Sequence, residues 1–402
     1  MSEDIATVVT VTWEPADAEG VVVWHDHIAV PGANGRAVLY GLAPDTDVDF
    51  HVVTDRWVSE EHEIRTGSLP AGFPEVTLSE DADLGAPYVL GSWMEGASSG
   101  TGLFVLDAAG AVVWYWLPTW GVVPAAHLSR TGRDVLYLES SYDGMADARA
   151  VRVSLDGTTR TVIPLPYAHH DIIEIDVPGV QFATIVGELR DIDGQAVVGD
   201  GIVEVLDDGT QRQVWSAFDH FEVGSDVGWD FLDYAFGADW VHANGLIYDA
   251  TDDAYYISLF MLRSVVKVDR ATGETLWVFD GSGESFAFTN DDGFGPQHAP
   301  EIVDGEVLFF DNSYGTGVSR LVRYALDHEA GTATRTWEWE HPDARYTFVL
   351  GDVDTREGGG HLSSWGSYGE IVATDATDAV QWHASLGTGH IVAQVEDFPA
   401  FP

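Results

Sequence analysis

Along most of the chain, apolar and polar residues alternate with a period of two, which is typical of β-strands. One unit recurs: an alternating apolar strand, a turn with Asp or Gly, and a second strand that often ends in Trp. The D-G or D-x-x-G turn predicts a β-hairpin in each copy. The copies are GLFVLDAAGAVVWYW from Gly102, AVRVSLDGTTRTVI from Ala150, GIVEVLDDGTQRQVW from Gly201, SVVKVDRATGETLWVF from Ser264, LVRYALDHEAGTATRTWEW from Leu321 and GEIVATDATDAVQW from Gly369.

The spacing of these hairpins predicts the architecture. Roughly 50–60 residues per copy are enough for four short strands, the size of a propeller blade. We therefore expect an all-β protein in which residues 81–402 form a six-bladed β-propeller, or a seven-bladed one if a degenerate copy is present. No long amphipathic helix is expected.

The N-terminal segment has a different pattern. VVTVTWEP, VVVWHDH and RAVLYGLAPDTDVDFHVVT alternate in period two, and GLAPDTDVDFHV resembles a corner motif of fibronectin type III domains. We expect residues 1–68 to form a fibronectin/Ig-like β-sandwich. Residues 69–80 would form a linker, because Gly and Pro in GSLPAGFP interrupt strands.

Composition narrows the possible partners. The chain has 66 acidic and 18 basic residues, a formal net charge of −48 that repels nucleic acid and anionic membranes and suits a salt-rich habitat. No apolar run reaches the ~18–20 residues that span a bilayer. The start, MSEDIATVVTVTW, shows no signal-peptide pattern. With no cysteine, disulfides and thiolate chemistry are excluded. We expect no nucleic-acid partner and no membrane insertion.

Histidines recur at the start of the segments that precede the hairpins. These segments should form the innermost strands, whose ends converge at one mouth of the central channel. Within AHHD, strand alternation predicts His169 and Asp171 on one face and His170 on the other, and we assign His170 to the channel. The tryptophans that recur along the chain are expected to pack between the sheets, but three of them lie near the predicted mouth, where flanking an aromatic substrate is the alternative. The histidines are His127, His169, His170, His242, His298 and His361, and these three tryptophans are Trp93, Trp240 and Trp365.

Clustered imidazoles support three chemistries. One can act as a nucleophile with neighbours as general acids. Several can stabilise an oxyanion, and three or four can bind a divalent metal. Asp171 would orient an imidazole or complete a metal site. A purely structural role, copied by repeat duplication, is the alternative.

Several stretches resemble the bacterial arylsulfate sulfotransferase family: HHDIIEI, WVHANGLIYDATDDAYYIS, SVVKVDRATGETLWVFDG and FGPQHAPEIVDGEVLFFDN. The resemblance covers about residues 85–395 and implies a six-bladed propeller with its active site at the channel mouth. Such enzymes move a sulfuryl group from a phenolic sulfate ester to a phenol without a nucleotide sulfate donor. The resemblance implies that His298 becomes transiently sulfated, and that His242, Asn244 and His170 assist it. The substrate site would be lined by His169, His127, His361, Phe260, Arg263 and Trp240.

The sequence departs from the family at one position. The family carries an arginine in an S-x-R segment after the W-x-H histidine, where it would grip the sulfuryl oxygens. Here that position is Phe260, and in a regular strand Arg263 would face the opposite side. Loss of such a cation should weaken oxyanion stabilisation by about 2–4 kcal/mol.

Two other functions remain open at this stage. A divalent metal bound by His170, His242, His298 and Gln297, or by Asp171, would make a metal-dependent lyase- or oxygenase-type enzyme. A non-catalytic binding propeller is the third hypothesis. Under the first hypothesis no cofactor is needed and the partner is a small aromatic molecule. The family resemblance implies a periplasmic, envelope-associated or extracellular location, and the sequence makes no prediction of oligomeric state.

Overall fold

The protein is almost entirely β-structure in a computed structural model that describes residues 5–24, 28–79, 84–95, 100–141, 145–224, 237–290, 293–313 and 317–402. Within these ranges the helices are short, namely α1 (Ala217–His220) and the 3-10 turn η1 (Gly366–Tyr368). None of the helices in the described ranges has the length and apolar character needed to cross a membrane.

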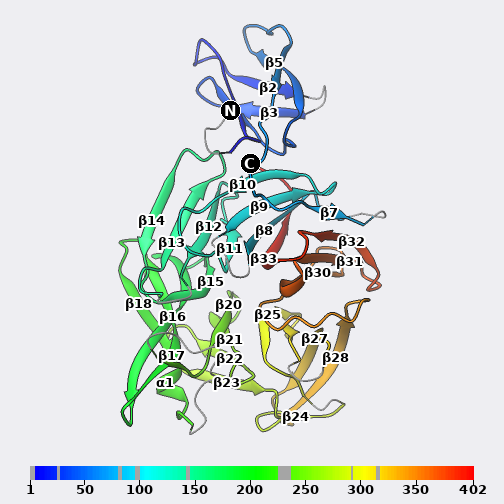
Figure 1. The fold of residues 1–402 in the computed structure, drawn as a ribbon. Coiled ribbons are helices and arrows are strands. Elements are labelled where there is room, and N and C mark those ends of the chain that lie inside the picture. Colours follow the sequence, from blue (N-terminus) through cyan, green and yellow to red (C-terminus); the bar gives the residue numbers. More distant parts are fainter. Residues whose placement is uncertain are drawn as a thin grey trace.

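Six antiparallel sheets, each built on four strands, follow one another around the larger part of the molecule (Figure 1). The first sheet combines β8 (Tyr88–Glu95), β9 (Thr101–Asp107) and β10 (Val112–Trp116) with the C-terminal β33 (His390–Phe398). The second contains β11 (Ala126–Leu128), β12 (Asp134–Glu139), β13 (Arg149–Ser154) and β14 (Arg160–Pro164). The third contains β15 (Ala168–Ile173), β16 (Val180–Ile192), β17 (Gln195–Leu206) and β18 (Gln211–Ser216), with β19 (Ala238–Asp239) added beside β17.

The remaining three sheets repeat this order. The fourth contains β20 (Ala243–Asp249), β21 (Ala254–Leu259), β22 (Ser264–Asp269) and β23 (Thr275–Asp280). The fifth contains β25 (Gln297–Val303), β26 (Glu306–Asp311), β27 (Arg320–Asp327) and β28 (Thr332–Glu340), with β24 (Ala287–Phe288) beside β28. The sixth contains β29 (Asp352–Thr355), β30 (His361–Trp365), β31 (Glu370–Thr374) and β32 (Val380–Ser385), with β7 (Thr77–Leu78) beside β32.

The innermost strands of the six sheets contact one another in a closed ring, in the order β11, β15, β20, β25, β29, β33 and back to β11. Each predicted hairpin is present and forms the outer two of the four strands of its sheet, including the first sheet, where the copy from Gly102 forms β9 and β10. The sheets therefore radiate from one axis, and the inner strand of the first sheet comes from the other end of the chain.

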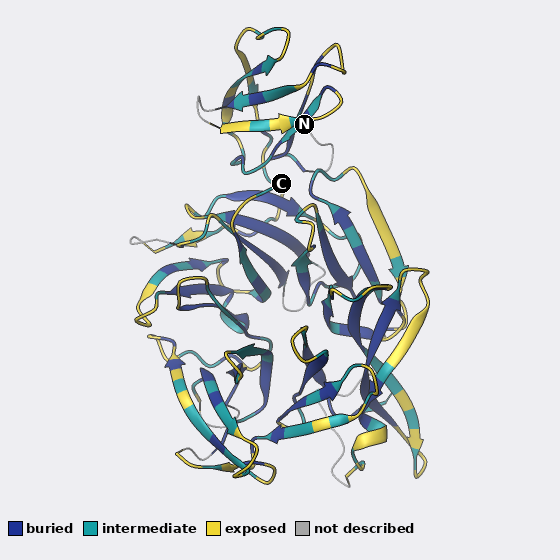
Figure 2. Cartoon of the chain, turned by 180° about the vertical axis from the view of Figure 1, so that it is seen from behind, coloured by how far each residue is buried: buried dark blue, intermediate teal, exposed yellow. Residues whose placement is uncertain are grey.

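Burial follows this radial order (Figure 2). The strands near the axis are buried on both faces, as β21 shows along its whole length, whereas outer strands such as β14 and β18 are largely exposed. Apolar clusters fill the spaces between neighbouring sheets, so that β17, β21 and β22 share one core. A fully buried strand such as β21 has little room to move, so it can hold the neighbouring inner strand and its side chains in a precise arrangement.

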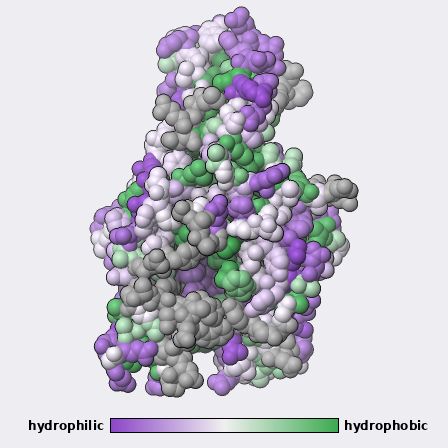
Figure 3. Space-filling model, in the orientation of Figure 1, coloured by the Kyte–Doolittle hydropathy of each residue, from purple (hydrophilic) through white to green (hydrophobic). Residues whose placement is uncertain are grey.

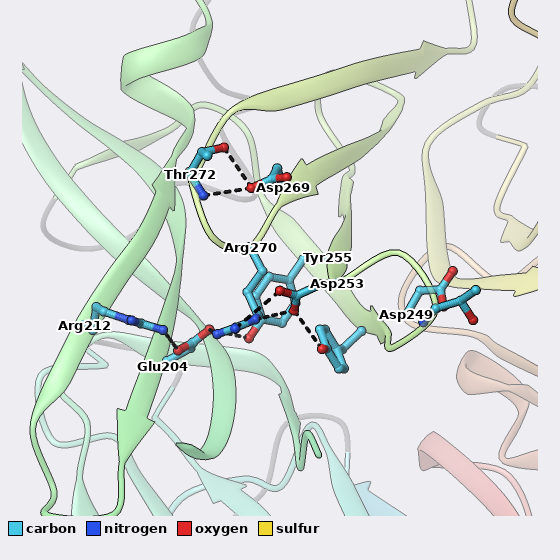
Figure 4. Close-up of polar contacts among 10 residues, drawn as sticks. Glu204, Arg212, Asp249, Asp253, Tyr255, Asp269, Arg270 and Thr272 are labelled. Carbon is cyan, nitrogen blue, oxygen red and sulfur yellow. Dashed lines mark hydrogen bonds and ion pairs between the residues drawn. The ribbon is translucent and has the colours of Figure 1, made fainter. Parts of the chain in front are cut away.

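Ion pairs supplement this apolar packing between the third and fourth sheets (Figure 4). Glu204 on β17 is fully buried and accepts hydrogen bonds from Tyr255 Oη at 2.9 Å and Arg270 Nη1 at 3.2 Å. Arg212 pairs with the same carboxylate, and Arg270 also pairs with Asp253 in the β21 hairpin. A buried carboxylate needs such partners, because an isolated one would be costly in an apolar interior.

The N-terminal strands form a separate two-sheet unit. One sheet pairs β1 (Val9–Thr12) with β4 (Arg36–Leu39), and the other has the order β3 (Ile28–Gly32), β2 (Gly20–Trp24), β5 (Asp47–Thr54), β6 (His62–Arg65). The unit has its own apolar core. It meets the larger part through Tyr40, which stacks on Phe401 at 5.2 Å, and through an Arg36–Asp156 ion pair at 2.8 Å. Hydrophobic residues gather at this junction in Figure 3. The segment expected as a linker, 69–80, supplies β7 to the sixth sheet.

Candidate active site

Three of the predicted histidines lie together where the inner strands of the third, fourth and fifth sheets meet. The rings of His170 and His242 have centroids 4.6 Å apart. Phe260 lies edge-on to both His242, at 5.6 Å, and His298, at 5.3 Å. This placement is consistent with the prediction that histidines far apart in the chain would meet around one axis. Phe260, which stands at the position of the family arginine, is buried. We call His170, His242 and His298 the axial histidines.

Irregular backbone turns these side chains toward one another. His170 has φ of 59° and His242 has φ of 48°, a left-handed conformation that is uncommon outside glycine. Two extra residues between His169 and Ile172 break the pairing of β15 with β16, so the strand alternation assumed from the sequence does not hold there. Strained backbone of this kind is often found at functional sites.

Asn312 fixes the protonation of His298. Its Nδ2 donates to the carbonyls of Thr347, at 3.0 Å, and Leu350, at 2.9 Å, so its Oδ1 must face the ring. That oxygen lies 2.7 Å from His298 Nδ1, which therefore carries the proton, and Nε2 of the neutral ring carries the lone pair. Burial lowers the pKa of His298 to about 3, despite the bond to Asn312 and with help from His242. The ring is therefore neutral, and its Nε2 has an unprotonated lone pair.

His242 has the opposite electrostatic setting. Its Nδ1 lies 2.5 Å from Oδ2 of Asp239, a fully buried carboxylate whose Oδ1 also accepts from the His242 backbone N–H at 3.2 Å. Burial alone would lower the pKa of His242, but the Asp239 carboxylate, aided by Asp200, raises it above the ordinary value. Asp239 thus favours the protonated form of His242, although burial also raises the pKa of the Asp239 carboxyl.

His170 is backed by a second histidine. Its Nδ1 lies 2.7 Å from Nδ1 of His169, whose Nε2 lies 3.0 Å from Asp200 Oδ1. His169 is 1% exposed, whereas His170 is half-buried and borders solvent. Burial lowers the pKa of His170 well below its ordinary value, and the neighbouring His242, His169 and His298 lower it further.

Asn244 and Gln297 tie the inner strands together. Asn244 Nδ2 donates to the Gln297 carbonyl at 2.8 Å, and Gln297 Nε2 donates to Ser258 Oγ at 3.1 Å and to the Ser264 carbonyl at 2.8 Å. Both amides are buried and hold β20, β21 and β25 in register. Gln297 is directed toward β21 and β22 and not toward a group of imidazoles.

His127 forms a separate ion pair. It lies between Asp171, at 3.4 Å from Nε2, and Glu396, at 3.2 Å from Nδ1. Burial opposes its charge, but these two carboxylates raise the pKa of His127 well above its ordinary value. Asp171 also accepts from the backbone N–H of Leu246 at 2.7 Å, so this pair connects β11, β15, β20 and β33. His127 and Asp171 hold the strands that carry the axial histidines.

His361 is not at the head of an inner strand, and that prediction was wrong. It begins β30, the second strand of the sixth sheet, because β29 precedes it along the chain. Its ring stacks on Trp337 of β28 at 4.0 Å, and its Nε2 lies 3.3 Å from Arg323 Nη2. The histidine that does begin an inner strand is His390 on β33, which the hairpin pattern missed because that strand closes the first sheet.

The predicted tryptophans have the packing role expected of most tryptophans in this chain. Trp93, Trp240 and Trp365 are all buried in apolar clusters. Phe260 and Arg263 lie in the turn between β21 and β22, not in a strand, so alternation does not decide their directions. Arg263 is exposed, and within the described ranges no hydrogen bond or ion pair joins its guanidinium to an axial histidine.

A second cluster has the spacing of a metal site. Among the residues that the structure describes, one group of three offers ligand atoms within 4.8 Å of one another: His341, Glu370 and His383. It lies between the fifth and sixth sheets and contains none of the residues predicted as ligands. We call it the Glu370 cluster.

Sequence reasoning missed the groups that orient the axial histidines. These are Asp200 on β17, Asp239 on β19 and Asn312, just after β26. Asp239 could have been suspected, because it stands three residues before His242. Asp200 and Asn312 gave no local signal, since their contacts depend on how the strands pair.

No curated protein matches this sequence. Several solved structures are similar to it. A Bacteroides caccae protein of unknown function has 13% identity and a TM-score of 0.46, over 77% of this chain and 97% of that one. A streptogramin B lyase has 13% identity and a TM-score of 0.42, over 81% and 90%. A periplasmic gluconolactonase of Pseudomonas aeruginosa has 13% identity and a TM-score of 0.43, over 78% and 99%.

The match to a sequence family is more specific. The family described as Arylsulfotransferase (ASST) matches residues 93–396, a range that holds every axial histidine and the groups that orient them. Because this range is most of the chain, the protein belongs to the arylsulfotransferase family.

Proposed function

We propose that the protein moves a sulfuryl group from a phenolic sulfate ester to a phenol through a transient sulfohistidine at His298. The observation that carries this proposal is the bond from His298 to Asn312, which leaves Nε2 unprotonated and available. Family membership supports the reaction class. No nucleotide donor or metal is required by this scheme.

The reaction has two steps. The His298 Nε2 lone pair attacks sulfur, the S–O bond to the donor breaks, and a phenolate leaves. The oxygen of a second phenol then attacks sulfur, the S–N bond breaks, and the acceptor proton passes to a base. This division into two displacements gives ping-pong kinetics.

His242 would stabilise the sulfuryl oxygens in both steps. Asp239 keeps it cationic, and a fixed positive charge in a site with little water is a strong source of transition-state stabilisation. We propose that it replaces the family arginine, whose position Phe260 fills. The Phe260 ring, edge-on to two histidines, would then offer an apolar face to a phenyl ring.

The architecture proposed for this enzyme is a six-bladed β-propeller over residues 81–402 and a fibronectin/Ig-like sandwich over residues 1–68, joined by 69–80. The closed ring of six inner strands and the separate N-terminal core support it. A periplasmic, envelope-associated or extracellular location would suit a donor-ester enzyme without a nucleotide cofactor. The proposed partner is a small aromatic molecule, with no nucleic acid and no membrane insertion.

Intact-mass analysis after incubation with 4-nitrophenyl sulfate tests the proposal. We expect one added sulfuryl group in the native protein, none in His298→Ala, and an unchanged gain in His220→Ala, a matched control at an exposed histidine on α1. Metal content is measured on the same sample. Absence of the adduct, with turnover that needs one bound metal per chain, would favour the metal-dependent alternative. Absence of both adduct and turnover would favour a binding protein.

A further inference from the structure

His169 and Asp200 stand behind His170 in a continuous hydrogen-bond chain. His169 is buried between them, with Nε2 3.0 Å from Asp200 Oδ1 and Nδ1 2.7 Å from His170 Nδ1. Asp200 has no exposure, and its Oδ2 accepts from the Ala243 N–H at 2.6 Å, at the start of β20. The carboxylate is therefore fixed by two strands.

The chain determines where the protons are. A carboxylate only accepts, so His169 Nε2 carries a proton. The Nδ1 of a neutral His169 then accepts, and its donor is Nδ1–H of His170. The remaining nitrogen of His170, Nε2, is unprotonated. Two neighbouring residues can bond in this way because the left-handed backbone at His170 turns its ring back toward His169.

We propose that Asp200, His169 and His170 form a proton relay that takes the proton of the acceptor phenol. This inference rests on the function proposed above. The phenol O–H transfers its proton to His170 Nε2 while the oxygen attacks sulfur. The Nδ1 proton of His170 then moves to His169 Nδ1. His169 becomes an imidazolium that keeps its Nε2–H on Asp200. The proton taken from the acceptor then returns by the reverse sequence to solvent or to the phenolate that departs in the next cycle.

The relay solves an electrostatic problem. His170 faces His169 on its own strand, His242 just before β20 and His298 on β25. A charge left on His170 would lie beside the cationic His242. Passing the proton inward moves that charge next to a buried carboxylate, where it is stabilised. His169 acts through His170 and is a positioning and relay residue.

The relay also indicates the substrate class. A base is needed only when the acceptor hydroxyl is un-ionised at the working pH, as for simple phenols with pKa near 10. An acidic nitrophenol is already ionised and needs none. The inferred acceptors are therefore unactivated phenols.

The His169→Gln variant separates the transfer of the proton from the orientation of the His170 ring. The amide can donate to Asp200 and accept from His170 Nδ1–H, so the orientation of His170 is kept, but it cannot take up the proton. We expect formation of the sulfohistidine from 4-nitrophenyl sulfate, measured by rapid quench, to change by less than about twofold. Transfer to phenol should fall by about 10²–10⁴-fold, the usual contribution of acid–base catalysis. Transfer to an ionised nitrophenol acceptor should be spared, and His220→Gln is the matched control.

Three results would overturn the relay: equal losses in both steps, an undiminished rate to phenol, or no selective sparing of the ionised acceptor. A nitrogen NMR experiment on the native protein is independent of the reaction. We expect the Nδ1–H form of His170 and the Nε2–H form of His169, and the reverse pair contradicts the relay even if sulfuryl transfer occurs. If the protein shows the expected pair of tautomers but forms no sulfohistidine, the proposed function and its relay are refuted. The hydrogen-bond chain itself would still stand.

Discussion

The axial histidines and the Glu370 cluster both gather imidazoles and carboxylates in a buried setting, but their hydrogen bonds differ. Each axial histidine has its Nδ1 against a buried partner: His169 for His170, Asp239 for His242, and Asn312 for His298. The partner therefore holds the Nδ1 side of each ring, and Nε2, the reacting nitrogen, lies on the opposite side. The orientation of each ring is set before any substrate arrives.

In the Glu370 cluster, residues outside the cluster bond Glu370 and His341, whereas His383 Nε2 is buried without a hydrogen-bond partner among the described residues, 3.8 Å from Glu370 Oε1. Arg345 binds both oxygens of Glu370, at 2.7 and 3.0 Å, and His341 Nδ1 accepts from the Asp343 N–H at 3.1 Å. A neutral His341 then has its proton on Nε2, which faces Glu370 at 3.7 Å. Burial lowers the pKa of His341 to about 4, and the charges of His383 and Arg345 add to this.

The comparison teaches that the number of clustered histidines does not decide chemistry. The groups behind them do, because they choose which nitrogen holds the lone pair and which ring holds the charge. A metal at the Glu370 cluster would have to compete with Arg345 and move the His341 proton. Substitutions of the groups that hold the imidazoles should therefore affect sulfuryl transfer differently in the two regions.

Among the substitutions that compare these two regions, the largest effect is expected at Asp239, which supports the charge on His242. Asp239→Asn keeps an acceptor near His242 but removes the charge that sustains its imidazolium. We expect kcat to fall by about 10²–10³-fold, as when an oxyanion-stabilising donor is lost. Because the pKa of His242 is raised in the native protein, activity should persist above the ordinary histidine range and decline as pH rises through that pKa. In Asp239→Asn the decline should move to lower pH.

A kcat/KM profile against pH checks this. The pKa of about 3 for His298 predicts that no loss of nucleophile accompanies acidification from about pH 7 to 5. An alkaline limb that stays in place in Asp239→Asn would contradict the role given to His242.

A smaller effect is expected at Asn312. Asn312→Ala leaves His298 Nδ1 and the carbonyls of Thr347 and Leu350 without this partner, so the ring loses its orientation. We expect the rate of sulfohistidine formation to fall by about 10–100-fold, in line with the cost of small misplacements. The free energy of unfolding should fall by about 1–3 kcal/mol because buried polar groups lose their bonds.

Rapid-quench kinetics and urea unfolding on the same variant separate the two effects. Ser319→Ala is a useful control for the backbone around this site, because Ser319 Oγ bonds the Thr347 N–H and the Asn312 carbonyl without touching His298 or the Asn312 side chain. If Asn312→Ala is destabilised but becomes sulfated at the native rate, Asn312 only stabilises the connection that contains Thr347 and Leu350.

Much of this arrangement was predictable from the sequence, for a physical reason. Hairpins are local, and alternation with a D-G turn determines them within about fifteen residues, so all six were found. His170, His242 and His298 were found because each begins an inner strand or immediately precedes one. The error at His361 and the omission of His390 both arose where an inner strand lies outside the repeat, at β29 and β33.

The orienting groups could not be predicted in the same way. Asp200 reaches His169 across β16 and β17, and Asn312 reaches His298 across the β25–β26 pair. These contacts depend on register and on bulges, such as the break between His169 and Ile172. Alternation alone placed His169 and His170 on opposite faces, whereas the left-handed residue brings their rings together.

The smallest effect on activity is expected in the Glu370 cluster. Glu370→Gln removes the charge that Arg345 binds and the carboxylate facing His341 and His383. Arg345 is partly exposed, which screens the pair, so we expect the free energy of unfolding to fall by about 1–2 kcal/mol. Sulfuryl transfer should stay within about twofold of the native rate, because this cluster orients no axial histidine directly. Glu329→Gln, an exposed position in the β27–β28 turn, controls for the change in net charge. A loss of transfer comparable to that of Asp239→Asn would mean that the two regions are coupled, most directly through the 341–350 connection whose Thr347 and Leu350 carbonyls hold Asn312.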